Sequence, residues 1–205
     1  MNQPIETKGQ RTARRIMDAA ETLFAQQGYG DTTLRQIAAA ADLQEPGLYN
    51  HFGSKRALYE AILHRGLDPM LEALSRHLAQ AEGLRDYTDL PAVMTDLLLD
   101  HPQMAALFQQ AMQGDPTSIG NQMVQVWLQS LFEHGVRSME AAGAIDDEDA
   151  ESLAINVIAM FNLTTGYFLS QRAFNMLTEG SLEHPDNIAR QKRLLRKVIR
   201  AMLIS

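Results

Sequence analysis

The chain has no cysteine among its 205 residues, few aromatic residues, and no long run that is apolar throughout. Without cysteine, disulfide bonds and thiolate metal sites are excluded, and the composition fits a reducing cytoplasm. No apolar segment follows the first basic residues, so we expect no signal peptide. The longest stretch without charge, 152–171, contains several Asn, Thr and Ser residues. This composition indicates a buried helix rather than a membrane span, and we expect no membrane association.

Motifs for catalysis and for cofactor binding are also missing from the sequence. It has no Gly-rich phosphate loop, no nucleophile elbow and no internal repeat. The six histidines do not have the spacing of metal ligands. The acidic run 146–149 is better explained as the start of a helix, where negative charge complements the helix dipole. We therefore expect no metal, no cofactor and no enzymatic activity.

The net charge of −7 argues against a protein that coats nucleic acid over its whole surface. The charge is unevenly divided. Residues 1–65 hold eight Lys or Arg and seven Asp or Glu, whereas the remainder holds ten basic and eighteen acidic residues. Any nucleic-acid site must therefore depend on where individual charges lie in the first part of the chain.

Apolar residues recur at helical spacing along the whole chain, and no alternating strand pattern appears. The spacing predicts helices over about 10–27, 89–100, 102–112, 118–142, 148–178 and 186–204. Gly28 is expected to stop the first helix. Ser54 is expected to cap another helix, in which Asp68-Pro69 predicts a kink or a restart. The sequence thus predicts an all-α protein.

The most specific pattern lies between residues 33 and 55. Thr33 and Gln36 fit a capping box, which predicts that a helix starts at Thr33. An apolar stripe follows at Leu34, Ile37, Ala38 and Ala41. A second, very short helix is predicted over 46–52, with Pro46 in its first turn. Two short helices joined by a tight turn are typical of a helix-turn-helix.

This segment resembles the DNA-binding signature of TetR/AcrR-type bacterial transcription regulators. The resemblance rests on Thr32–Ala38, Gly47–Phe52 and Ser54-Lys55, and it covers roughly the first third of the chain. It implies an all-α homodimer, with a DNA-binding domain of three helices over 1–53 and an effector-binding and dimerisation domain over 54–205. The chain departs from the family at Asp42, where Gly is common, and at Gln44-Glu45, where a small cap residue and a neutral or basic residue are usual.

The resemblance also assigns DNA contacts to individual residues. It implies phosphate contacts for Thr33, Tyr49, His51 and Lys55, and contacts at or near base edges for Arg35, Gln44, Gly47 and Asn50. Beside a helix-turn-helix, the basic start of the first helix also favours phosphate contacts for Lys8, Arg11, Arg14 and Arg15. The competing interpretation of Tyr49 is a half-buried core tyrosine. Glu45 either accepts a hydrogen bond from cytosine or repels the DNA backbone, and we favour the second.

The C-terminal part is expected to bind an effector between its middle helices. The candidate lining residues are Met123, Trp127, Met160, Phe161 and Tyr167, with Asn162 and Thr165 as polar groups. Ordinary core packing is the competing interpretation for each of them. The helices near 148–178 and 186–204 are the expected dimer surface, as a four-helix interface. The six Lys and Arg residues of the last helix are better explained as a solvated face than as a DNA patch.

We therefore expect a one-component transcription regulator, a repressor that binds a palindromic operator in double-stranded DNA as a homodimer. A small, largely apolar effector would release it. Two alternatives stay open: an all-helical enzyme or carrier with a vestigial helix-turn-helix, and a DNA-binding dimer without an effector. An enzyme would need a catalytic constellation, and the sequence has none.

Overall fold

A computed structural model describes residues 6–81, 84–141 and 150–204, and within these ranges the regular structure is helical throughout. The helices are α1 (Lys8–Asp31), α2 (Leu34–Ala40), α3 (Glu45–Tyr49), α4 (Lys55–Ala79), α5 (Leu84–Tyr87), α6 (Leu90–Asp100), α7 (Met104–Gln113), α8 (Ile119–Ala141), α9 (Ala150–Leu169), α10 (Gln171–Leu177) and α11 (Pro185–Ile204). The all-α prediction is confirmed. The acidic run 146–149, expected to open a helix, lies outside the described residues.

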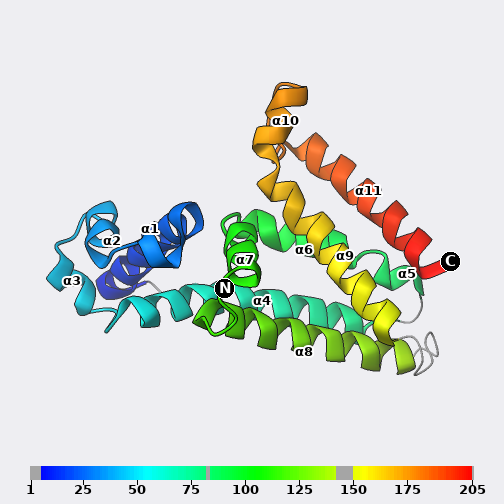
Figure 1. Cartoon of the computed structure of the whole chain (residues 1–205), viewed down its shortest axis with the longest axis horizontal. Helices are drawn as coiled ribbons and strands as arrows, with labels where there is room; N and C mark the ends of the chain where they lie inside the picture. The colour runs from blue at the N-terminus through cyan, green and yellow to red at the C-terminus, as the bar shows by residue number, and fades with distance from the viewer. Residues whose placement is uncertain (1–5, 82–83, 142–149, 205) are drawn as a thin grey trace.

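The first three helices form a small head at one end of the molecule, and the start of α4 completes its core (Figure 1). α1 begins before the expected position because Thr7 makes a capping box with Gln10. Gly28 interrupts α1 with a φ of +84°, which glycine adopts without steric cost, and a last turn follows to Asp31. The fully buried side chains that join the head are Ile16, Ala20, Phe24, Ile37, Leu48, Leu58 and Ile62.

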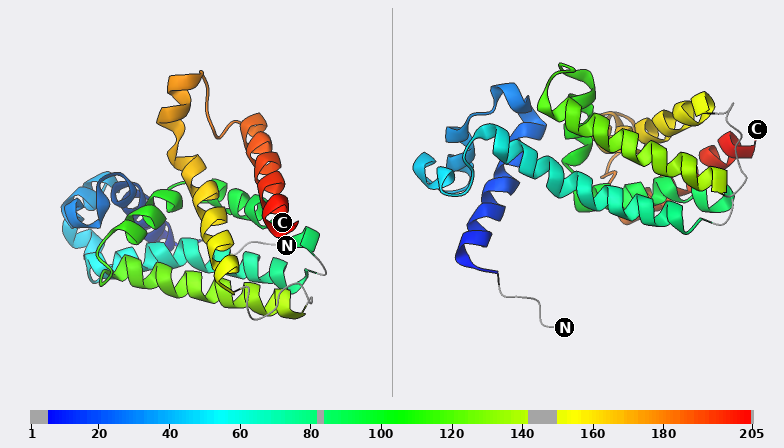
Figure 2. Two further views of the ribbon diagram at one scale, coloured as in Figure 1. Left: turned by 45° about the vertical axis from the view of Figure 1, so that its right-hand side comes forward. Right: turned by 90° about the horizontal axis from the view of Figure 1, so that it is seen from below.

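The helices α4 and α8 lie side by side and run in the same direction away from the head (Figure 2). Two hydrogen bonds fix their register. The indole Nε1 of Trp127 donates to the Leu67 carbonyl at 2.8 Å, and the Ser138 hydroxyl donates to the Leu78 carbonyl at 2.7 Å. This pair forms the long axis that connects the head with the rest of the molecule.

Of the kink or restart expected at Asp68-Pro69, the restart is wrong, because α4 passes through Pro69 as one helix. A proline removes one helix hydrogen bond, here the one to the Arg65 carbonyl. The neighbouring Leu67 and Met70 are buried in the core, and their packing holds the helix together across the proline.

Three helices project from the α4–α8 layer: α9 leaves it, α10 lies at the tip, and α11 returns (Figure 1). The single helix expected over 148–178 is therefore wrong, since the chain turns at Ser170 between α9 and α10. By length and composition alone, the segment Glu151–Leu169 is apolar enough to cross a membrane, but only 22% of it is buried within this chain. Its inner face packs against α6, α7, α8 and α11, as in a core helix, and no other part of the described chain covers its outer face.

Candidate nucleic-acid interface and ligand cavity

The turn between α2 and α3 is set by local hydrogen bonds. Thr33 caps α2 as predicted: its hydroxyl accepts from the Gln36 N–H at 3.2 Å, and the Gln36 side chain accepts from the Thr33 N–H at 2.7 Å. After α2 the chain bends at Asp42, which has a φ of +52°. The Leu43 N–H donates to the Ala38 carbonyl at 2.8 Å, which completes a Schellman-type ending. An aspartate thus occupies a position that favours glycine.

The short helix α3 depends on its neighbours for stability, because five residues cannot sustain a helix in water. Leu48 is fully buried and anchors α3 against α2 in the core of the head. Pro46 lies in its first turn, as predicted, and no side chain caps its N-terminus at Gln44. With Leu48 turned inward, the opposite side of α3 faces solvent at the outer end of the head (Figure 1).

Most residues expected to contact DNA lie on this exposed side. The side chains of Arg35, Gln44, Tyr49 and Asn50 are exposed, and those of Glu45 and His51 are half-buried. Tyr49 is 50% exposed, so half of its surface is accessible to a partner, as the competing interpretation of a half-buried tyrosine also allows. An added Cβ at Gly47 would meet only Leu43, at 3.9 Å, so its small size is not required by packing within the head. Thr33 is exposed at the start of α2.

Three of the five expected phosphate-binding cations, Arg14, Arg15 and Lys55, have partners inside this chain. Arg15 donates to the Ala41 carbonyl at the end of α2, and Arg14 forms an ion pair with Glu6 at 3.0 Å. The Lys55 ammonium donates to the Gly30 carbonyl at 3.2 Å and lies 4.4 Å from the centre of the Tyr29 ring. Burial lowers the pKa of Lys55, and the nearby Asp31 carboxylate opposes this shift. Arg15 and Lys55 therefore position backbone segments of the head.

A charged contact that sequence reasoning missed joins the head to the long axis. Arg65 on α4 pairs with two carboxylates of α1, with Asp18 at 2.6 Å and with Glu21. Burial alone would lower the pKa of Arg65, but the hydrogen bonds that it donates to Glu21 and Asp18 raise it. The partners lie 44 and 47 positions apart in the sequence, so no local pattern could have revealed the pair.

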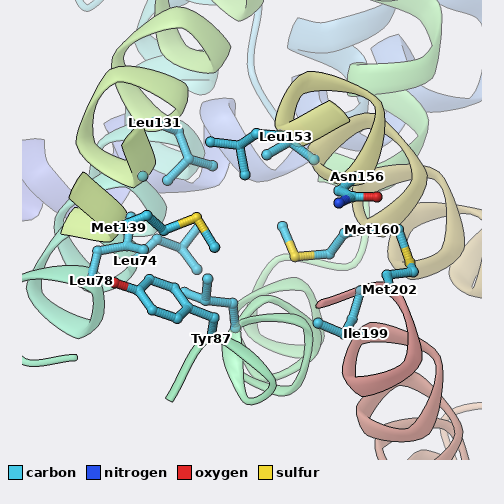
Figure 3. Close-up of a pocket in the computed structure, with 13 residues that line it drawn as sticks. Leu74, Leu78, Tyr87, Leu131, Met139, Leu153, Asn156, Met160, Ile199 and Met202 are labelled. Atoms are coloured by element: carbon cyan, nitrogen blue, oxygen red, sulfur yellow. The ribbon is translucent and has the colours of Figure 1, made fainter. Parts of the chain in front are cut away.

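The C-terminal part contains an apolar cavity between α4, α5, α6, α8, α9 and α11 (Figure 3). Its lining residues are Leu74, Leu78, Tyr87, Leu90, Leu131, Gly135, Met139, Leu153, Asn156, Val157, Met160, Ile199 and Met202. The space open to the centres of water-sized molecules is about 70 Å³, so a larger ligand requires side chains to move. The flexible Met139 and Met160 point into this space and can make that adjustment (Figure 3).

The cavity offers few polar groups, and one of them is already engaged. The Ser138 hydroxyl gives its proton to the Leu78 carbonyl, so the Tyr87 hydroxyl donates to Ser138, at 2.8 Å. The amide of Asn156 makes no hydrogen bond with the described residues and remains available. Asn156 falls in the helical stripe that Leu153, Val157 and Met160 also form, and an amide within such a stripe is the sequence signal that could have identified it.

Of the expected effector-binding residues, only Met160 lines this cavity. Trp127 and Phe161 belong to an aromatic cluster with Phe108, with ring centres 5.0–6.3 Å apart. Met123 packs against the core, Thr165 is buried and donates to the Phe161 carbonyl, and Asn162 is exposed. Tyr167 donates to the Leu182 carbonyl at 2.7 Å, near the tip of the α9–α11 projection. Among the described residues, no group of three His, Asp or Glu could hold a metal ion.

The head is similar to known regulatory proteins. Residues 16–62 match the model of bacterial regulatory proteins of the tetR family. The chain is 38% identical over 87 residues to the HTH-type transcriptional repressor KstR2 of Rhodococcus jostii (strain RHA1), a match that covers 42% of this chain and 41% of that repressor. The match thus spans about two fifths of the length of this curated relative.

Solved structures resemble the chain over nearly its full length. The fatty acid degradation regulator FadR from Bacillus halodurans aligns with a TM-score of 0.71 and 15% identity, over 100% of this chain and 98% of that one. The transcriptional regulator FadR from Bacillus subtilis, in complex with stearoyl-CoA, aligns with a TM-score of 0.64 and 12% identity, over 91% and 96%. Identities this low demonstrate the shared fold alone.

Proposed function

We propose that the chain is a one-component transcriptional repressor of the tetR type, because its residues 16–62 match the model of bacterial regulatory proteins of the tetR family. It binds a palindromic operator as a homodimer and is released when a small molecule enters the C-terminal cavity. The observation that carries this proposal is the outer side of the head. There, Arg35, Gln44, Tyr49 and Asn50 are exposed around a buried anchor, Leu48.

These exposed groups have the chemistry that DNA recognition needs. Arg35 can pair bidentately with guanine, and Gln44 or Asn50 can pair with adenine in the major groove. The Tyr49 hydroxyl and the N–H groups at the start of α2 suit phosphate oxygens. Arg15 and Lys55 support DNA binding indirectly, because they hold the ends of α2 and α1 in place.

The uncovered face of α9 supports the homodimer. Ile155 and Ile158 are 66% and 61% exposed in the protomer, and Leu194 of α11 is 55% exposed. A monomeric protein rarely leaves several large apolar side chains together on one surface. The same patch on a second copy would cover them around a two-fold axis, which also suits a palindrome.

The lining of the cavity supports an effector whose buried part is apolar and uncharged. Its walls carry no charged side chain, so a carboxylate or phosphate inside would stay unpaired at high cost. The Asn156 amide can bond to one polar group of the ligand. A long acyl chain meets these requirements, and stearoyl-CoA in the Bacillus subtilis neighbour makes acyl compounds the first ligands to test.

The DNA-binding role can be tested with an operator selected from a random duplex library. Affinity measured by fluorescence anisotropy should fall steeply with salt, because Lys and Arg side chains displace phosphate counterions. Tyr49→Phe should weaken binding to operator and random DNA alike, since it removes a positioning contact. Tyr87→Phe, in the C-terminal cavity, is the matched control and should leave both affinities unchanged. A flat salt dependence, or a Tyr49→Phe loss confined to one base pair, would contradict the assignment.

A further inference from the structure

A cleft lies where the head meets α7 and the start of α8. Tyr29 of α1 and Tyr59 of α4 line it on the side of the head, and the segment between α7 and α8 lines it on the other side. α7 lies beside the head, and its Gln110 donates to the Ala25 carbonyl of α1 at 2.8 Å (Figure 1). The volume of the cleft is about 570 Å³, which lies within the range of small-molecule sites. The cleft therefore has room for a small ligand.

The start of α8, which lines the cleft, carries two N–H groups without a partner. The N–H groups of Ile119 and Gly120 make no hydrogen bond with the described residues, whereas the Ser118 hydroxyl accepts from the Asn121 N–H at 3.2 Å. α8 has 23 residues, and the dipole of a long helix adds positive potential at its first turn. This end of α8 therefore favours a negatively charged hydrogen-bond acceptor.

The Tyr59 hydroxyl is a third donor without a partner at the same place. Tyr59 is 4% exposed, and its hydroxyl makes no hydrogen bond with the described residues. A Cβ on Gly120 would lie 2.8 Å from this hydroxyl, so a glycine there lets the hydroxyl lie against the first turn of α8. No fully enclosed side-chain nitrogen or oxygen in the described chain lacks a partner, so this unpaired hydroxyl is open to the cleft. Burial and the nearby Tyr29 raise the pKa of Tyr59 to about 12, so the hydroxyl keeps its proton and can donate it.

Two charged side chains of opposite sign also line the cleft. Arg56 is exposed and pairs with Glu60 at 2.9 Å. Asp115 accepts hydrogen bonds from the Thr117 N–H and hydroxyl, both at 2.8 Å, and these bonds lower its pKa. Asp115 is therefore negative and opposes the positive charge of Arg56. Because these two charges offset each other, the preference of the cleft for an anion comes from its three unpaired donors.

We propose that this cleft binds a small organic anion, a carboxylate or a phosphate ester, whose acidic group accepts hydrogen bonds from the Tyr59 hydroxyl and from the N–H groups at the start of α8. The apolar part of the ligand lies against the Tyr29 ring. The site is separate from the C-terminal cavity, whose walls carry no charged side chain and which takes an apolar group. A ligand in the cleft contacts the head and the C-terminal part at once.

Benzoate and phenyl phosphate are the probes, and benzamide is the uncharged match to benzoate. The full chain, with its glycines labelled with nitrogen-15, reports on both sites by nuclear magnetic resonance, because Gly120 lines the cleft and Gly135 lines the C-terminal cavity. At least one of the anions should shift the Gly120 amide resonance and leave that of Gly135 unchanged, and the tighter of the two identifies the acidic group. Benzamide should bind about tenfold more weakly than benzoate, since hydrogen bonds to a charged acceptor are stronger. No shift at Gly120 with either anion, a shift at Gly135 alone, or equal binding of benzamide overturns the proposal.

Two substitutions at the cleft should change the affinity in opposite directions. Tyr59→Phe should raise the dissociation constant of the bound anion about tenfold, since it removes one donor, and it should not lower the melting temperature, since the hydroxyl has no partner within the chain. Asp115→Asn should lower the dissociation constant about twofold to fivefold, because it removes a like charge and can still accept from Thr117. Tyr87→Phe, in the C-terminal cavity, is the matched control and should leave binding unchanged. Unchanged binding in Tyr59→Phe, or weaker binding in Asp115→Asn, would show that no anion lies at the start of α8.

Discussion

Asp42 and Glu45 place two carboxylates in the turn between the helices of the DNA-binding motif. Asp42 affects the stability of the fold, and Glu45 affects both the helix and its affinity for DNA. Asp42 has a positive φ at the end of α2, so its effect is on backbone conformation. Glu45 opens α3, where a carboxylate complements the helix dipole but also faces a polyanion. The two positions can therefore be tested separately, one by stability and one by DNA affinity.

Asp42→Gly should stabilise the chain by about 0.5–1 kcal/mol, because glycine adopts a positive φ without the clash that a Cβ makes. Asp42→Ala should give no such gain, since alanine has the same clash and loses the short polar side chain. Urea unfolding followed by circular dichroism measures both. A stability for Asp42→Gly at or below that of the original chain would show that the aspartate makes a compensating contact.

Glu45→Ala should tighten binding to operator and scrambled DNA by similar factors, because it removes repulsion near the phosphates. The expected cost to the helix is about 0.3–1 kcal/mol from the lost dipole interaction. Titration of both duplexes at one salt concentration makes the comparison. A loss of about 1–3 kcal/mol on the operator alone would instead mean that Glu45 accepts a hydrogen bond from cytosine.

At the scale of elements, local sequence signals predicted most helix positions correctly. Thr33 with Gln36, Ser54 and Gly28 act within three or four residues, so their effects on α2, α4 and α1 are readable from the chain. The turn at Ser170 was missed because no glycine or proline marks it. The rotation of α9 about its axis was also missed, since packing decides that Asn156 rather than Asn162 faces the cavity.

The element-scale contact with the largest expected effect is that of Arg65 with α1. Arg65→Ala should destabilise the chain by about 2 kcal/mol, because it leaves the Glu21 carboxylate, 9% exposed, without its cation. Arg56→Ala is the matched control: its pair with Glu60 is exposed, and its loss should cost at most about 0.5 kcal/mol.

Differential scanning calorimetry compares the two variants. The double variant Arg65→Ala with Glu21→Gln should recover part of the loss, since the unpaired charge is gone. Equal effects of Arg65→Ala and Arg56→Ala would mean that the link between α1 and α4 is an ordinary surface pair.

At the scale of the whole molecule, α4 connects the cavity with the head. Leu74 and Leu78 of α4 line the cavity, and Arg65 of the same helix holds α1. The space inside is smaller than a ligand with a long acyl chain, so binding must move the walls. A movement of α4 would reach the head through Arg65. An effector acts in this way only if it binds one arrangement of the two heads more tightly than the other.

Filling the cavity with a larger side chain should therefore prevent the effector from changing the distance between the two heads. Val157→Phe adds bulk to the lining and should cost about 1–3 kcal/mol in stability. With spin labels on Ala39→Cys, an exposed position of α2, electron paramagnetic resonance measures the distance between the heads of the dimer. A long-chain acyl-CoA should shift this distance in the Ala39→Cys chain and leave it unchanged when Val157→Phe is added.

An equal shift in both chains would mean that the ligand acts from a site other than this cavity. Acyl-CoA bound with no shift in either chain would mean that it is not the inducer.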